Sequence, residues 1–211
     1  MVRDEPVTWR AARRLNVIAL YGGAVRMRFL IRLKAPEAPP ARLLAAVSAI
    51  ARTFGADPRN PKWTSYGALE LDVFSATRAD FDLFVSAARP LAEFEFTKDL
   101  NVAPPHKDEG ALFEEARSLF NAERYWESHE VLEGVWRNKH GEEKRLLQGI
   151  ILVCAAFVHH QKGEPQVAMG VLKRSVPLLE YPGDYGGFRV ARIRKDVQNL
   201  IGTGSIANFR V

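Results

Sequence analysis

The first hundred residues combine short stretches of alternating apolar and polar side chains with two amphipathic helical stretches. Residues 26–33 alternate with a period of two, which predicts a half-buried strand, and Gly67 separates two further alternating runs as a hairpin turn would. Thr77 is placed to cap the second helix. The expected elements are a strand at 26–33, a helix at 39–54, strands at 62–66 and 68–74, a helix at 77–89 and a strand at 93–97. This order is the ferredoxin-like βαββαβ arrangement.

The pattern changes to a helical period after residues 103–106, which read as a linker. The stretch at 142–161 is apolar on nearly all sides, so we expect it at the centre of a bundle. Helices are predicted at 110–121, 123–138, 142–161, 165–180 and 188–201. The fold class is therefore an α+β ferredoxin-like domain followed by an all-α helical bundle domain. The expected division is a basic leader at 1–23, the α+β domain at 24–102, the bundle at 108–201 and a tail at 202–211.

The formal net charge of +5 over 211 residues suggests an acidic partner, but its location weakens that interpretation. Residues 1–34 hold eight basic and two acidic side chains, whereas residues 108–211 are balanced at 14 of each. In the usual strand order, Arg28 and Arg32 are flanked by acidic residues on the neighbouring strands. Such pairs cancel the field that a phosphate would feel. We therefore expect a self-neutralised, solvent-facing sheet surface, and nucleic acid is disfavoured as a partner.

The N-terminal leader places basic residues before the short apolar run at 15–21, as a signal peptide does. The run is short and no small-residue cleavage site follows, so a surface element or an upstream extension before Met27 is the favoured interpretation. No stretch reaches the roughly 18 apolar residues of a membrane span. The single cysteine, Cys154, requires no oxidising compartment and is expected to be buried and inert. We expect a cytoplasmic protein.

The most informative helix is residues 125–136, because it places ionisable groups among aromatic ones. With His129 at 0°, Trp136 falls at about −20°, Glu133 at about 40°, Trp126 at about 60° and Glu130 at about 100°. Glu133 is therefore expected to be a buried carboxylate that needs a hydrogen-bonding partner. In a tight antiparallel hairpin with the next helix, Gln148 lies opposite Glu133 and Arg145 opposite Trp136.

Two interpretations of this cluster stay open. His129, Glu133 and Gln148 form a satisfied network that fixes the register of the helices, or they line a functional pocket. The sequence His129-Glu130-x-x-Glu133 also resembles the HExxH pattern of zinc peptidases, with Glu133 in place of the second histidine. His129 and Glu133 are thus candidate ligands of a divalent metal, although no third ligand is evident. Phosphate-binding loops, nucleophile elbows and dinucleotide-binding glycine patterns are absent.

The same residues resemble the all-helical family called domain of unknown function 309. The resemblance rests on Phe120, Asn121, Tyr125, Trp126, Glu127, His129, Glu130, Glu133 and Trp136, on Leu147-Gln148-Gly149-Ile150-Ile151, and on Tyr181-Pro182 with Tyr185-Gly186-Gly187. It covers about residues 110–201 and implies a compact helical bundle. It implies no activity, and it does not extend to residues 1–107.

The favoured hypothesis is a binding module for a small molecule or a protein partner. The candidate ligand-binding residues are Tyr125, Trp126, Trp136, Arg145 and Gln148. The alternative is a metal-assisted hydrolase, with Glu130 or Glu133 as general base and His129 as metal ligand or acid. Association of two copies through the apolar helices stays open.

Overall fold

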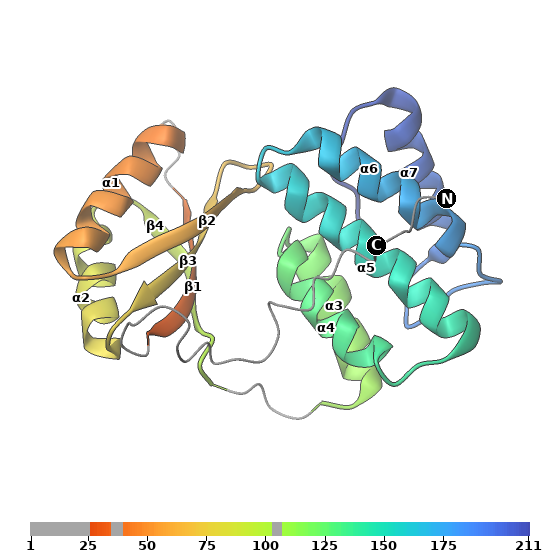
Figure 1. The fold of residues 1–211 in the computed structure, drawn as a ribbon, viewed down its shortest axis with the longest axis horizontal. Coiled ribbons are helices and arrows are strands. Elements are labelled where there is room, and N and C mark those ends of the chain that lie inside the picture. The colour runs from red at the N-terminus through yellow and green to blue at the C-terminus, as the bar shows by residue number, and fades with distance from the viewer. Residues whose placement is uncertain (1–25, 35–39, 103–106) are drawn as a thin grey trace, which may run out of the picture.

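The computed structural model describes residues 26–34, 40–102 and 107–211, which form two parts side by side (Figure 1). The first part contains β1 (Met27–Lys34), α1 (Pro40–Thr53), β2 (Asp57–Trp63), β3 (Leu69–Ser75), α2 (Arg78–Ala88) and β4 (Glu93–Asp99). The second contains α3 (Glu109–Asn121), α4 (Tyr125–Trp136), α5 (Gly141–Gln161), α6 (Pro165–Ser175), the 3₁₀ turn η2 (Val176–Leu178) and α7 (Val190–Thr203). The predicted fold class, an α+β domain followed by a helical domain, is confirmed.

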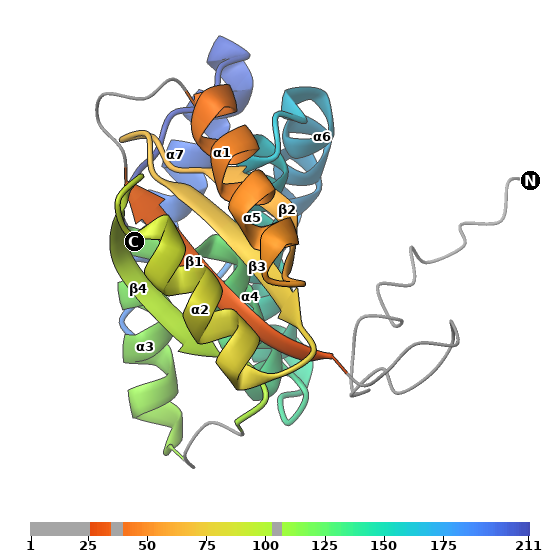
Figure 2. The same cartoon turned by 90° about the vertical axis from the view of Figure 1, so that its left-hand side faces the viewer.

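The strands of the α+β part form an antiparallel sheet in the order β2-β3-β1-β4. Helices α1 and α2 cover one face of this sheet, as the rotated view shows (Figure 2). Alternate residues of β1 point into this core, where Phe29 stacks on Phe81 of α2 with ring centroids 3.8 Å apart. Thr77 caps α2 as predicted, because its hydroxyl accepts a hydrogen bond from the Asp80 N–H at 3.1 Å.

The first strand of the hairpin was predicted wrongly. A strand was expected at 62–66, but the observed strand β2 spans Asp57–Trp63 and includes Pro58 and Pro61. These prolines argue against a strand in a central position, but β2 lies at the edge of the sheet. A register shift between Arg59 and Lys62 accommodates the irregular segment, in which Asn60 has a positive φ of 52°.

Helix α5 crosses the centre of the helical part, with α4 and α6 packed against it and α3 packed on α4 (Figure 1). Its side chains are buried along most of its length, as its apolar sequence predicts. At Gly149 an added Cβ would lie 3.0 Å from the Leu178 Cβ, so this glycine lets α5 approach η2 closely. The predicted helix at 165–180 ends earlier, at Ser175, and continues as the 3₁₀ turn.

A two-residue turn explains the Gly186-Gly187 pair. The backbones of Tyr185 and Phe188 exchange hydrogen bonds of 3.1 and 2.9 Å, and both glycines have positive φ (56° and 77°). This is the geometry of a type I′ turn, which favours glycine at both central positions. A Cβ on Gly186 would lie 2.5 Å from the Phe113 ring, so the turn also packs directly against α3.

The expected leader at 1–23 and the expected linker at 103–106 lie outside the described residues. Among the described helices, none combines the length and the apolar character needed to span a bilayer.

Candidate functional site

Helix α4 buries only one side of the predicted face, the side that carries Tyr125 and Leu132. Its buried side chains are Tyr125, Glu127, Ser128, Leu132 and Val135. Trp126, His129 and Glu133 are only partly buried, and Glu130 is exposed. The expectation that Glu133 is the buried carboxylate was therefore wrong. Relative to the predicted orientation, α4 is rotated about its axis so that Trp126, His129 and Glu133 lie at the boundary between the core and solvent.

The buried carboxylate of α4 is Glu127, which is 7% exposed. Arg124 donates two hydrogen bonds to it, at 2.6 and 2.7 Å, and the Lys98 ammonium on β4 donates a third at 2.5 Å. Burial alone would raise the pKa of Glu127, but these two cations more than compensate and hold its pKa below the usual value. Glu127 therefore stays ionised and joins the helical part to the sheet.

His129, Glu130 and Glu133 form a compact cluster at the surface of α4. Each offers one ligand atom, and these atoms all lie within 4.8 Å of one another. His129 Nδ1 lies 3.6 Å from a Glu130 carboxylate oxygen. This Nδ1 atom is buried and has no hydrogen-bond partner among the described residues, whereas 45% of the Glu130 side chain is exposed. The cluster therefore combines an unsatisfied imidazole nitrogen with an accessible carboxylate.

Aromatic residues flank this cluster. The Trp126 ring stacks on the His129 ring, with centroids 5.5 Å apart and an interplanar angle of 9°. Lys144, rather than the predicted Arg145, lies over the Trp136 ring at 4.4 Å.

The other three predicted contact residues lie in different settings. Tyr125 is 1% exposed and stacks on Phe157 in the core, so it does not reach a surface ligand. Arg145 donates to the Pro177 carbonyl at 2.7 Å. Gln148 is partly buried on α5. Only Trp126 and Trp136 of the predicted set therefore share α4 with the cluster and remain partly exposed.

The junction between the two parts is the feature that sequence reasoning missed. On the β3 side the charges of this sheet face pair as predicted, with Arg32 Nη2 2.8 Å from the Glu70 carboxylate, but on the β4 side Phe96 rather than an acidic residue faces Arg32. Lys62 on β2, which was not predicted, places its Nζ 2.5 Å from the same carboxylate. The predicted solvent exposure of this face was wrong, because all three charged side chains are at most 4% exposed. Arg32 also donates to the carbonyls of Ala122 and Glu123, at 2.8 and 3.1 Å. The sheet face thus docks on the turn between α3 and α4.

Glu123 is the centre of this junction. Its carboxylate accepts hydrogen bonds from Ser65, at 2.7 Å from the backbone N–H and 2.5 Å from the hydroxyl. Its carbonyl accepts from Gln161 at 2.9 Å, in addition to Arg32. Glu123 ends α3 in a Schellman motif, in which the position with positive φ is usually glycine, but here φ is 57° at a glutamate. We infer that its bonds across the junction offset this backbone strain.

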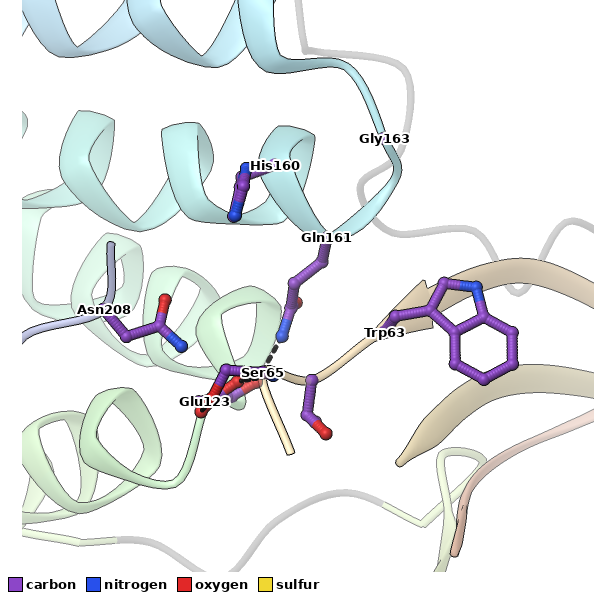
Figure 3. A pocket seen from close by; sticks show the side chains of 8 residues that line it. Trp63, Ser65, Glu123, His160, Gln161, Gly163 and Asn208 are labelled. Atoms are coloured by element: carbon purple, nitrogen blue, oxygen red, sulfur yellow. Dashed lines mark hydrogen bonds between the residues drawn. The ribbon is translucent and has the colours of Figure 1, made fainter. Parts of the chain in front are cut away.

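A pocket of about 300 Å³ opens beside Glu123. It is lined by residues 63–65 of the β2–β3 turn, by Glu123, by His160, Gln161 and Gly163 at the end of α5, and by Asn208 of the C-terminal tail. In Figure 3 the Gln161 side chain reaches toward Glu123, and the Trp63 ring points away from His160. His160 Nδ1 is buried with no hydrogen-bond partner in the described part of the chain.

Two other titratable residues take no part in these sites. Cys154 is fully buried, and burial raises the pKa of its thiol to about 12, which supports the expected inertness. His159, in the last turn of α5, forms a 2.5 Å contact with Glu164.

Comparison with known proteins matches part of the helical domain to a family. Residues 113–171 match a family described as a domain of unknown function (DUF309). An "Uncharacterized protein" of Aquifex aeolicus (strain VF5) is 29% identical over 102 residues, which are 47% of this chain and 31% of that protein. The chain thus spans about a third of that relative. A crystal structure of a conserved hypothetical protein from Thermus thermophilus is 36% identical, with a TM-score of 0.38, over 43% of this chain and 95% of that one.

Proposed function

The helical domain of this chain belongs to the DUF309 family, and because that family carries no assigned activity, we propose a function from the residues themselves: binding of a divalent metal ion by His129, Glu130 and Glu133. The observation that carries the proposal is the convergence of their three ligand atoms within 4.8 Å. The buried His129 Nδ1 without a partner supports it, since leaving a buried polar atom unpaired costs about 1–3 kcal/mol.

The arrangement suits an ion that accepts nitrogen and oxygen ligands together. Donor atoms about 2.1 Å from a tetrahedral zinc lie roughly 3.4 Å apart. The 3.6 Å between His129 Nδ1 and the Glu130 oxygen is already close to that spacing. The longer distances between ligand atoms, up to 4.8 Å, can shorten through rotation of the flexible glutamate side chains. An imidazole with two carboxylates favours Zn²⁺ or Mn²⁺ over a hard ion such as Mg²⁺.

The test is a calorimetric titration of the full chain with Zn²⁺, together with elemental analysis of the protein after dialysis. We expect one bound ion per chain. His129→Ala should raise the Kd for Zn²⁺ by at least tenfold. Losing a residue that only hydrogen-bonds a metal ligand already lowers metal affinity by about 10- to 100-fold, and losing a ligand itself should cost no less.

His140→Ala is the matched control for this titration, because His140 is a histidine outside the cluster, just before α5. It should bind Zn²⁺ like the wild type. Equal binding by wild type and His129→Ala, or no binding by the wild type, would show that the cluster is not a metal site.

A second candidate, metal-assisted hydrolysis, is favoured by the exposure of Glu130. Catalytic zinc sites typically hold three protein ligands and keep one position for water. Glu130 at 45% side-chain exposure leaves the cluster open to a substrate. The test is hydrolysis of p-nitrophenyl acetate and bis-p-nitrophenyl phosphate with and without Zn²⁺. Hydrolysis that requires both Zn²⁺ and His129 supports the candidate, and Zn²⁺ binding without hydrolysis of either compound rejects it for these bond types.

A further inference from the structure

We propose that the pocket beside Glu123 is a second site, separate from the metal cluster, that binds a small organic amine through its ammonium group. The pocket is built by segments that are distant in sequence: the β2–β3 turn, the α3–α4 turn, the end of α5 and the C-terminal tail. Its volume of about 300 Å³ is at the lower end of the range for ligand pockets. A short aliphatic amine fits this size, and a drug-sized molecule does not.

The charge of the pocket favours a cation. The two turns that line the pocket hold the C-termini of α3 and α5 together with the N-termini of α4 and α6, so the partial charges of the helix ends largely cancel there. The Glu123 carboxylate adds a full negative charge, and no Lys or Arg is among the described lining residues. Two buried cations close to the pocket, Arg32 and Lys62, are already paired with Glu70, and Arg32 also donates to the carbonyls of the α3–α4 turn. An ammonium group in this pocket would therefore face the negative charge of Glu123 without competition from a Lys or Arg among the described lining residues.

Unused hydrogen-bonding capacity lies on the same walls. Each Glu123 carboxylate oxygen accepts one bond from Ser65, so each retains a further acceptor position. Asn208 also lines the pocket, and its amide oxygen adds a further acceptor (Figure 3). His160 Nδ1 has no partner in the described structure, and in the tautomer protonated at Nε2 it accepts a hydrogen bond. An ammonium group offers three donors, which matches this set of acceptors.

The experiment is a calorimetric titration of the full chain with putrescine at constant ionic strength. Its neutral counterpart is 1,4-butanediol, which has the same carbon chain and hydroxyl groups in place of ammonium groups. We expect putrescine to bind at one site and 1,4-butanediol not to bind. Glu123→Gln should raise the putrescine Kd roughly tenfold or more, because a hydrogen bond to a charged group contributes about 1.5–3 kcal/mol.

A control variant separates the local charge of Glu123 from a general change in net charge. Glu142→Gln removes the same charge at an exposed position at the other end of α5, and should bind putrescine as the wild type does. The proposal is overturned if putrescine does not bind, if 1,4-butanediol binds equally well, or if Glu123→Gln binds like Glu142→Gln.

Discussion

Replacing Arg32 by methionine is expected to destabilise the folded chain by about 3–5 kcal/mol, the usual cost of removing one partner from a buried ion pair. Methionine keeps much of the length of the side chain but leaves Glu70 with Lys62 alone. It also removes the donor that reaches the carbonyls of Ala122 and Glu123. The measurement is urea unfolding followed by circular dichroism and by tryptophan fluorescence.

Arg26→Met is the matched control, because Arg26 forms an ion pair with Asp57 in which the side chains are 49% and 37% exposed. Pairs of this kind contribute about 0–1 kcal/mol. We also expect the two spectroscopic transitions of Arg32→Met to separate, since the junction it breaks joins the sheet to the helices. A loss no larger than that of Arg26→Met would mean that the buried network does not hold the two parts together.

Local sequence patterns were sufficient for most of the fold. The alternation at 26–33 placed β1 within one residue, and the long apolar stretch predicted a helix at 142–161, one residue short of the observed start of α5 at Gly141. Both signals depend on neighbours along the chain, where period and burial are directly related. The hairpin was the exception. Pro58 and Pro61 made β2 unrecognisable from local sequence, because a strand accepts proline only at the edge of a sheet. Whether a strand lies at the edge depends on the topology of the whole domain.

The junction could not be predicted because its contacts are remote in sequence. Arg32 meets Glu123 across 91 residues, and no periodicity relates them. Glu127 illustrates the same limit within a single helix. It lies about 160° from His129 around α4, so an amphipathic pattern centred on the aromatic residues assigns it to solvent. The sheet covers that side, and Lys98 of β4 supplies the partner that makes burial of Glu127 tolerable.

The residues that carried the family resemblance divide into two groups. Several have structural roles: Asn121 bonds to the backbone of Val211, Gly149 permits helix contact, and Gly186 occupies a turn of positive φ. His129 and Glu130 are not explained by packing in the same way: the His129 ring stacks on Trp126, but its Nδ1 neither accepts nor donates a hydrogen bond in the described structure, and Glu130 is exposed. This contrast is why the proposed metal site rests on these two residues and Glu133 rather than on the rest of the motif.

Phe157→Ala is the change in the helical domain for which we expect the largest loss, about 3–5 kcal/mol of unfolding free energy. Phe157 has no exposed surface, and its ring contacts Tyr125 of α4, Phe120 of α3 and Phe209 of the tail at centroid distances of 4.8, 5.6 and 5.5 Å. Alanine leaves a cavity where four segments meet, and a close-packed core fills such a cavity only partly. The measurement is urea unfolding of the full chain.

Val167→Ala provides the matched control, because this α6 side chain is 49% exposed and its removal should change stability by less than about 0.5 kcal/mol. The Phe157 cavity lies directly beneath the first turn of α4, where Tyr125 stacks on the missing ring. Because His129 follows Tyr125 by one helical turn, Phe157→Ala should also weaken Zn²⁺ binding under conditions in which the chain remains folded. Unchanged Zn²⁺ affinity in the folded variant would mean that the cluster keeps its geometry through contacts other than this aromatic core.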